Sequence, residues 1–235
     1  MILSALKSRV RRLYNRMTPA ESISSSKVKW DRLATENARY YIYSEQGKAI
    51  NEGDFRAAGA RDYEALIAQD TFLQERLNPF SAKAVLEIGC GTGRLTEFIA
   101  QHFAQVLGVD ISATMIEQAR ARLASVANAT FIATDGRSLP ARDASIDFVF
   151  SYIVFQHMPD VATVRANLAE VARVLRPGGI AKIQLRGREV EKGQWFYGPA
   201  FRQRDLRDLL EGLPVTTIRE EGEGERYYWI TLLKH

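Results

Sequence analysis

The sequence has few residues able to form disulfides or bind metals. Its 235 residues include one cysteine, Cys90, and three histidines, His102, His157 and His235. One cysteine excludes an internal disulfide framework and is compatible with a reducing compartment. The histidines lack the spacing of metal ligands, so we expect no metal. No apolar run approaches the roughly 20 residues of a membrane span. We therefore expect a cytoplasmic protein, which could still bind to a membrane surface.

Acidic residues are scarce at the N-terminus. Residues 1–32 contain eight basic and two acidic residues, a net charge of +6, so the remainder carries −2 of the total +4. The main body therefore lacks the positive surface that nucleic-acid binding requires, and we expect no nucleic-acid partner. In MILSALKSRVRRLYNRM the apolar residues recur at helical spacing, which predicts a basic amphipathic extension over residues 1–26. Three interpretations stay open. Residues 1–20 contact an anionic membrane surface or a partner, they form an organelle presequence, or they pack on the protein itself or form a frayed terminus.

From residue 83 onward, strand-like and helix-like segments alternate. The expected strands are AVLEIG, QVLGVD, TFIATD, IDFVFSYI and IAKIQLR, with helices over 94–103, 112–126 and 160–176 between them. This alternation predicts an α/β fold with a parallel sheet covered by helices on both faces. A helix over 202–213 and two strands joined at GEGE predict a C-terminal antiparallel hairpin.

The preceding segment is expected to form a separate helical cap or lid over residues 27–80, ahead of a single domain over 81–235. Two boundaries carry specific expectations. The serine-rich segment ESISSSK is expected to be a break, and the helix over 160–176 is expected to end at Pro177. A further helix is expected over residues 61–77, ending before Pro79.

The stretch VLEIGCGTGRL, residues 85–95, places three glycines directly after the first expected strand. Glycine permits a positive φ and removes the Cβ that would hold a ligand away from the backbone. The second strand ends in Asp110, where an acid can accept hydrogen bonds from both ribose hydroxyls. The spacing G-x-G-x-G differs from the dinucleotide pattern G-x-G-x-x-G, and Glu87 suits a cationic ligand better than a pyrophosphate. A nucleoside ligand is therefore expected.

The motifs VLEIGCGTGRL, GVDIS, ATDGRSLP, IDFVFSYIVFQHMPD and RVLRPGG resemble, in order and spacing, those of class I S-adenosylmethionine-dependent methyltransferases of the small-molecule type. The resemblance covers about residues 83–185. It implies a Rossmann-like fold with a mostly parallel seven-stranded sheet, and S-adenosylmethionine as the methyl donor, with S-adenosylhomocysteine as product.

The resemblance also implies roles for individual residues. Those near the amino-acid end of the cofactor would be Glu87, Gly89, Cys90, Gly91, Gly93, Arg94 and the backbone of Ser151. Those near the ribose and adenine would be Asp110, Ile111, Met115, Asp135 and Gly136. For Ile111 and Met115, ordinary core packing is the alternative. Aromatic residues at 30, 40, 41 and 43, and at 195–197, are expected to wall the site, with Tyr40 or Tyr41 closest to the cofactor.

His157, in FQHMPD after the fourth strand, is the candidate catalytic residue. Histidine has an ordinary pKa near neutrality, so it could take a proton from an acceptor hydroxyl; a role in shaping the loop is the alternative. The sequence thus predicts methyl transfer, at oxygen, to a small molecule or to a glycan or lipid head group. A nucleotide-binding oxidoreductase and a catalytically silent methyltransferase-fold protein are the alternatives. The oligomeric state is not predicted.

Overall fold

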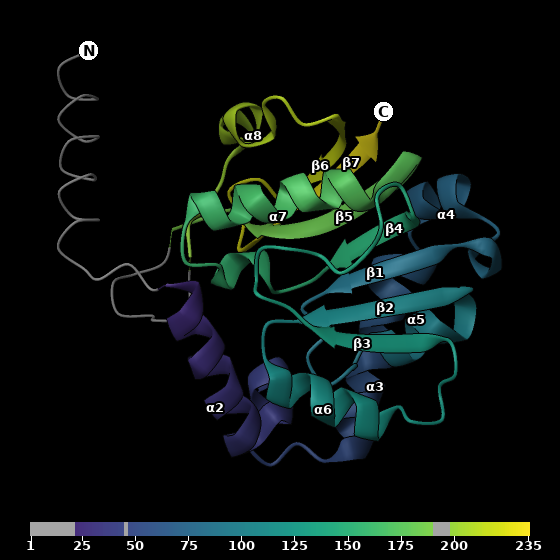
Figure 1. Ribbon diagram of the computed structural model, residues 1–235, viewed down its shortest axis with the longest axis vertical. Helices are drawn as coiled ribbons and strands as arrows, with labels where there is room; N and C mark the ends of the chain where they lie inside the picture. Colours follow the sequence, from purple (N-terminus) through teal and green to yellow (C-terminus); the bar gives the residue numbers. More distant parts are fainter. Residues whose placement is uncertain (1–21, 45–46, 190–197) are drawn as a thin grey trace, which may run out of the picture.

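The computed structural model describes residues 22–44, 47–189 and 198–235, built around a seven-stranded sheet in the order β3-β2-β1-β4-β5-β7-β6 (Figure 1). Its strands are β1 (Ala84–Ile88), β2 (Gln105–Asp110), β3 (Ala129–Ala133), β4 (Ile146–Ser151), β5 (Leu175–Arg186), β6 (Val215–Glu221) and β7 (Tyr227–Lys234). The first five strands pair in parallel, and β7 pairs antiparallel with β5 and β6. The predicted sheet and its C-terminal hairpin are confirmed.

Helices cover both faces of this sheet, as predicted. They are α2 (Ile23–Ile42), α3 (Glu52–Tyr63), α4 (Thr71–Leu77), α5 (Thr96–His102), α6 (Ala113–Arg122), α7 (Val161–Val174) and α8 (Gln203–Leu210), with short helical turns η2 (Glu64–Ala68), η3 (Phe80–Ala82) and η4 (Phe155–His157). Successive strand residues point to opposite faces. Leu86 and Val149 therefore pack with α7 and α8, whereas Val85, Phe148 and Phe150 pack with η2, α4 and α5.

The strand order creates a crevice beside the central strands. From β1 the chain builds outward to β2 and β3, then returns to place β4 on the other side of β1. In open parallel sheets, ligands bind at the carboxyl ends of the strands where the order reverses in this way. Figure 1 shows the arrowheads of β2 and β3 pointing toward α2, so α2 lies at that end of the sheet.

The serine-rich segment is not a break. Ser22 caps α2, its Oγ accepting a hydrogen bond from the backbone N–H of Ser25 at 3.1 Å, and the following serines form the first turns of the helix. Serine is favoured at this position because its side chain satisfies a backbone donor that the helix leaves unpaired. The expected boundary between residues 26 and 27 therefore falls inside α2.

Two other boundaries also differ from expectation. The helix α7 ends at Val174, three residues before Pro177, because Leu175 pairs with Ile146 in the sheet and Ser145 N–H bonds the Val174 carbonyl. The helix expected over 61–77 divides into the end of α3, then η2 and α4. Asp70 begins α4 by accepting from Phe72 and Leu73 N–H groups.

None of the helices in the described part of the chain combines the length and the apolar character needed to span a bilayer. The predicted amphipathic extension, apart from residues 22–26, and the aromatic residues at 195–197 lie outside the described residues. The expected roles of those two segments therefore stay predictions.

Candidate functional site

The glycine turn lies at the end of β1 and is tied to the neighbouring strand. Gly89, Gly91 and Gly93 all have positive φ, at 74°, 54° and 80°. The N–H groups of Gly89 and Cys90 both bond the Val109 carbonyl, at 2.7 and 3.0 Å. A Cβ on Gly89 would lie 2.1 Å from Val154 Cγ2. A side chain cannot fit there, so glycine is required for the turn to pass this close to the loop after β4.

A cavity opens beside this turn, at the carboxyl ends of β1, β2, β3 and β4, with α2 on its far side. Nine of the thirteen predicted cofactor residues line it: Glu87, Gly89, Cys90, Gly91, Arg94, Asp110, Ile111, Met115 and Gly136. The predicted catalytic residue His157 lines it as well. The sheet thus brings together residues spread over 71 positions of sequence.

Glu87 and Arg94 provide opposite charges near the turn. Glu87 is 3% exposed and accepts a hydrogen bond from Thr96 Oγ1 at 2.5 Å. Burial raises the pKa of Glu87 to about 7, against the opposing effects of Thr96 and Arg94. Arg94 is 4% exposed and forms an ion pair with Asp62 at 2.5 Å. This part of the cavity can therefore hold a group that carries both an ammonium and a carboxylate.

Asp110 lies at the end of β2 with its carboxylate held in place by backbone donors. It accepts from Gly91 N–H and from Ser112 N–H, both at 2.9 Å. Burial raises the pKa of Asp110 to about 6 despite these hydrogen bonds, and the charge of Asp31 acts in the same direction. Such a carboxylate retains lone pairs that can accept from ligand hydroxyl groups.

The opposite end of the cavity is apolar. A Cβ on Gly136, which has φ +79°, would lie 2.8 Å from Ile111 Cδ1 and 3.1 Å from Ile23 Cγ2. Met115 is buried and packs with Ala34 of α2. Flat apolar walls of this kind suit an aromatic ring such as adenine.

Four predicted cofactor residues do not line the cavity. Asp135 Oδ1 instead accepts from the N–H groups of Arg137 and Ser138, and these bonds lower its pKa. Ser151 is fully buried, and its hydroxyl donates to the Ile88 carbonyl. Gly93 and Tyr40 also lie outside the lining, and Tyr40 packs edge-on against Tyr41. Their predicted roles remain untested.

The sequence did not single out Ser26 and Thr163 as site residues. Their buried polar atoms indicate that the cavity is built for a ligand. Ser26 Oγ, Arg94 Nε and Thr163 Oγ1 are buried, line the cavity and have no hydrogen-bond partner among the described residues. Buried polar atoms without partners cost free energy, so a bound molecule would supply the missing bonds. The helical spacing of Ile23, Ser26 and Trp30 is the signal that could have placed Ser26 on the cavity side.

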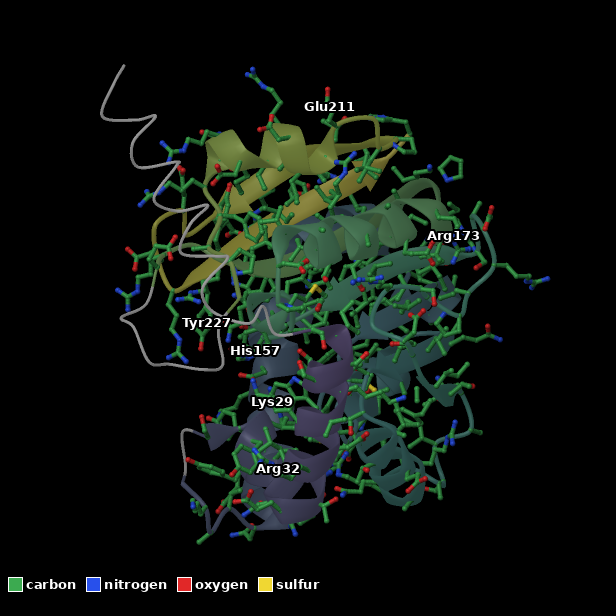
Figure 2. The ribbon with its side chains drawn as sticks, turned by 60° about the vertical axis from the view of Figure 1, so that its left-hand side comes forward. Lys29, Arg32, His157, Arg173, Glu211 and Tyr227 are labelled. Carbon is green, nitrogen blue, oxygen red and sulfur yellow. The ribbon has the colours of Figure 1, made fainter. Side chains whose placement is uncertain are left out.

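His157 lines the cavity and lies next to α2. Its ring is 5.5 Å from the ring of Trp30 in an edge-on arrangement, and Figure 2 shows it near Lys29, at the upper end of that helix. Trp30 and Tyr41 both line the cavity, in keeping with the predicted aromatic wall. No group of three or more His, Cys, Asp or Glu in the described residues could hold a metal ion.

The structure combines an open, mostly parallel sheet, a glycine turn after β1, an acid at the end of β2 and a cavity at the reversal of strand order. These features define an α/β protein that binds a nucleoside cofactor. A family model described as a methyltransferase domain matches residues 85–179. The chain is 30% identical over 193 residues to the malonyl-[acyl-carrier protein] O-methyltransferase of Serratia marcescens, covering 80% of this chain and 71% of that protein. The chain therefore belongs to the class I S-adenosylmethionine-dependent methyltransferases.

Other relatives agree with this family. Over 134 residues the chain is 37% identical to the trans-aconitate 2-methyltransferase of Deinococcus radiodurans, covering 56% of this chain and 45% of that protein. The chain spans only 32% of the length of another relative, the biotin biosynthesis bifunctional protein BioHC of Cellvibrio japonicus. Among solved structures, magnesium protoporphyrin IX methyltransferase from Synechocystis PCC 6803, with bound S-adenosylhomocysteine, aligns with a TM-score of 0.67 at 18% identity, covering 91% of this chain and all of that one. This likeness shows the same fold.

Proposed function

We propose that this chain transfers the methyl group of S-adenosylmethionine to an oxygen atom of a small-molecule acceptor, either free or carried as a thioester on a protein. The observation that carries this proposal is the cavity at the reversal of strand order, with three buried polar atoms that have no hydrogen-bond partner among the residues the structure describes. The relatives from Serratia and Deinococcus are a malonyl-[acyl-carrier protein] O-methyltransferase and a trans-aconitate 2-methyltransferase, and they support an acid-bearing small-molecule acceptor.

The residues present fit S-adenosylmethionine. Glu87 would hold the amino group of its methionine part. Arg94 Nε, for which the described part of the chain offers no hydrogen-bond partner, would donate to the carboxylate. Asp110 would accept from the ribose hydroxyls, and Ile111, Met115 and Gly136 would enclose the adenine. When bound, the cofactor supplies a methyl group on a positively charged sulfur, which an acceptor can attack directly.

The remaining part of the cavity would receive the acceptor. The cavity lining after β4 includes Tyr152, Ile153, His157 and Met158. Trp30 of α2 lies edge-on to His157. Aromatic and aliphatic side chains here would exclude water and hold the acceptor in line with the methyl group. Positioning of this kind supplies much of the rate of a direct displacement.

Several sequence predictions stand beside this proposal without further support. Three of them remain predictions: a glycan or lipid head-group acceptor, a cytoplasmic location, and membrane contact by residues 1–20. Family membership disfavours the oxidoreductase alternative. The silent methyltransferase-fold alternative predicts cofactor binding without turnover.

The test is methyl transfer from S-adenosylmethionine carrying a labelled methyl group. The acceptors would include trans-aconitate, malonyl thioesters, and alcohols and phenols of similar size. The proposal predicts label in an oxygen-methylated product and S-adenosylhomocysteine in equal amount. Tight S-adenosylhomocysteine binding with no turnover across the panel would instead favour the silent protein.

A further inference from the structure

The loop after β4 contains a strained residue of the cavity wall. Ile153 has φ +57°, a left-handed conformation that is an outlier for a β-branched residue. Among the non-glycine residues that the structure describes, only Ala144 also has a positive φ. Ala144 lies in an exposed turn, whereas Ile153 lines the cavity. Backbone strain of this kind costs free energy, so surrounding bonds must hold Ile153 in this conformation.

The side chain of Gln184, in β5, supplies such a bond. Its Oε1 accepts a hydrogen bond from the Ile153 N–H at 2.9 Å. Its Nε2 donates to the Leu185 carbonyl and, at 3.3 Å, to Gln156 Oε1. Gln184 is 0% exposed, and burying an amide is unfavourable unless its polar atoms are hydrogen-bonded. These bonds use the oxygen and both amino hydrogens, so the amide cannot rotate without losing them.

The residue that Gln184 holds lies between two parts of the proposed reaction site. Val154, the next residue, packs on the glycine turn, because a Cβ on Gly89 would lie 2.1 Å from Val154 Cγ2. The Val154 carbonyl also accepts from the His157 N–H at 2.8 Å, across the η4 turn. A change of φ at Ile153 would therefore displace Val154 and His157, and both line the cavity.

We propose that Gln184 is a positioning residue for methyl transfer, because it holds the loop over residues 152–154 in its strained conformation and so sets the cavity wall between the glycine turn and η4. Gln184 is not itself among the residues that line the cavity, so it acts through this loop. The inference rests on the proposed function, which places the methyl donor and the acceptor against this wall. A displacement of about 1 Å in such a wall can lower a rate by about 100-fold.

Amide hydrogen exchange tests the hydrogen bond in the ligand-free protein. Gln184→Met keeps the length of the side chain but offers the Ile153 N–H only a weak acceptor. In ¹⁵N-labelled protein, the Ile153 amide should exchange about ten-fold faster in Gln184→Met than in wild type. The control Gln203→Met, at the exposed start of α8, should leave this rate unchanged. Equal exchange of the Ile153 amide in Gln184→Met and wild type overturns the proposal.

The strain is tested at Ile153 itself, in variants that keep Gln184. Ile153→Ala and Ile153→Gly both remove the branched side chain, but only glycine adopts φ +57° without strain. The unfolding constant of Ile153→Gly should therefore be about five-fold smaller than that of Ile153→Ala in denaturant unfolding. This comparison does not require Gln184→Met to fold. An Ile153→Ala variant as stable as Ile153→Gly would contradict the strain on which the proposal depends.

Kinetics on the best acceptor of the methyl-transfer panel test the positioning role. Gln184→Met should lower kcat by about ten-fold. The affinity for S-adenosylhomocysteine should stay within about three-fold of wild type, because the groups that would bind the cofactor are unchanged. In the Ile153→Gly background the same substitution should lower kcat by about three-fold or less, since glycine adopts the loop conformation without Gln184.

The two backgrounds separate positioning from packing. An equal loss of kcat in both would show that Gln184 contributes packing alone, and it would overturn the proposal. Absence of turnover by the wild type on every acceptor would refute the proposed function, and with it the role in methyl transfer. The exchange and unfolding experiments would then still decide whether Gln184 holds the strained loop.

Discussion

At the scale of single residues, the site depends on two carboxyl groups with unusual protonation. Burial raises the pKa of Glu87 to about 7 and that of Asp110 to about 6. Both groups face a cavity that would receive a positively charged cofactor. A bound cation favours the ionised form of a nearby carboxyl group, so cofactor binding and deprotonation should be coupled.

We expect the affinity for S-adenosylhomocysteine to fall by about ten-fold between pH 8 and pH 6, because Glu87 becomes protonated over this range. The free energy of unfolding of the ligand-free protein should instead be higher at pH 6 than at pH 8. The folded-state pKa of Glu87 lies above its unfolded value, so the stability contributed by protonation is lost as pH rises through about 7. That contribution is on the order of 1 kcal/mol between pH 6 and pH 8. Calorimetric titration and denaturant unfolding at both pH values measure the two effects.

The variant Glu87→Gln cannot ionise and is the control for this prediction. It should bind S-adenosylhomocysteine weakly at both pH values, with a flatter pH dependence below pH 8. A wild-type affinity that does not change between pH 6 and pH 8 would remove Glu87 from the cofactor site.

Asp110→Asn should weaken S-adenosylhomocysteine binding by about 1–3 kcal/mol, because the amide loses acceptor capacity toward the ribose and toward Gly91 and Ser112 N–H. Calorimetric titration measures the change. The matched control is Asp208→Asn on the exposed face of α8, which should leave the affinity unchanged. Equal affinities of the Asp110 variant and the control would contradict the assigned role.

The residues that sequence reasoning placed correctly in the cavity are those in short local motifs. Gly89, Gly91 and Asp110 follow strands whose ends meet at one edge of a parallel sheet, so order along the chain was sufficient. Ser26 and Thr163 could not be assigned in this way, since their exposure to the cavity depends on how α2 and α7 pack.

At the scale of elements, α2 determines how the cavity is closed. Its residues Ile23, Ser26, Trp30, Tyr41 and Ile42 line one side. Asp31 of α2 bonds the start of α6: its Oδ1 accepts from Ser112 Oγ at 2.6 Å and from Thr114 N–H at 3.2 Å. Burial alone would raise the pKa of Asp31, but these hydrogen bonds lower it. The helix that lines one side of the cavity is thus hydrogen-bonded to the core beside the predicted ribose site.

Asp31→Ala should loosen α2 from α6 at a cost of about 1–2 kcal/mol, since two hydrogen bonds at a helix start are lost. Faster amide hydrogen exchange across α2, together with weaker S-adenosylhomocysteine binding, is the expected result. Glu117→Gln, on an exposed position of α6, is the control and should change neither quantity. Unchanged exchange in Asp31→Ala would show that α2 is held by its other contacts, such as the Gln118 Nε2 bond to the Ala34 carbonyl and its apolar packing.

Sequence patterns located most elements but not their ends. The alternation of apolar segments predicted the strands because each central strand is buried on both faces, as the wholly buried β4 shows. The serine-rich start of α2 was misjudged because capping serines and loop serines look alike in sequence. The end of α7 was misplaced because the pairing of Leu175 with Ile146, a tertiary contact, sets it.

At the scale of the whole molecule, a buried ion cluster joins the N-terminal helices to the sheet. Lys182 of β5 bonds the Leu66 carbonyl at 2.7 Å and Asp70 at 2.6 Å, and Arg219 of β6 also reaches Asp70 at 2.8 Å. Burial would raise the pKa of Asp70, but Lys182 and Arg219 hold it below its ordinary value. The segment expected to be a separate cap is thus connected to the sheet by charges from three parts of the chain.

Asp70→Asn should lower the free energy of unfolding by about 3–5 kcal/mol, because it leaves the charge of Lys182 buried without its carboxylate. Denaturant unfolding measures this loss. The double variant Asp70→Asn with Lys182→Met removes the stranded charge and should recover much of it. A single variant as stable as wild type would show that this cluster does not anchor the helices.

The central claim is that the cavity at the reversal of strand order binds S-adenosylmethionine as its cofactor. Calorimetric titration of the full chain with S-adenosylhomocysteine, and separately with NADH, tests it most directly. We predict saturable binding of S-adenosylhomocysteine at one site per chain, weakened by Asp110→Asn, and no binding of NADH. Binding of NADH without binding of S-adenosylhomocysteine would contradict the account.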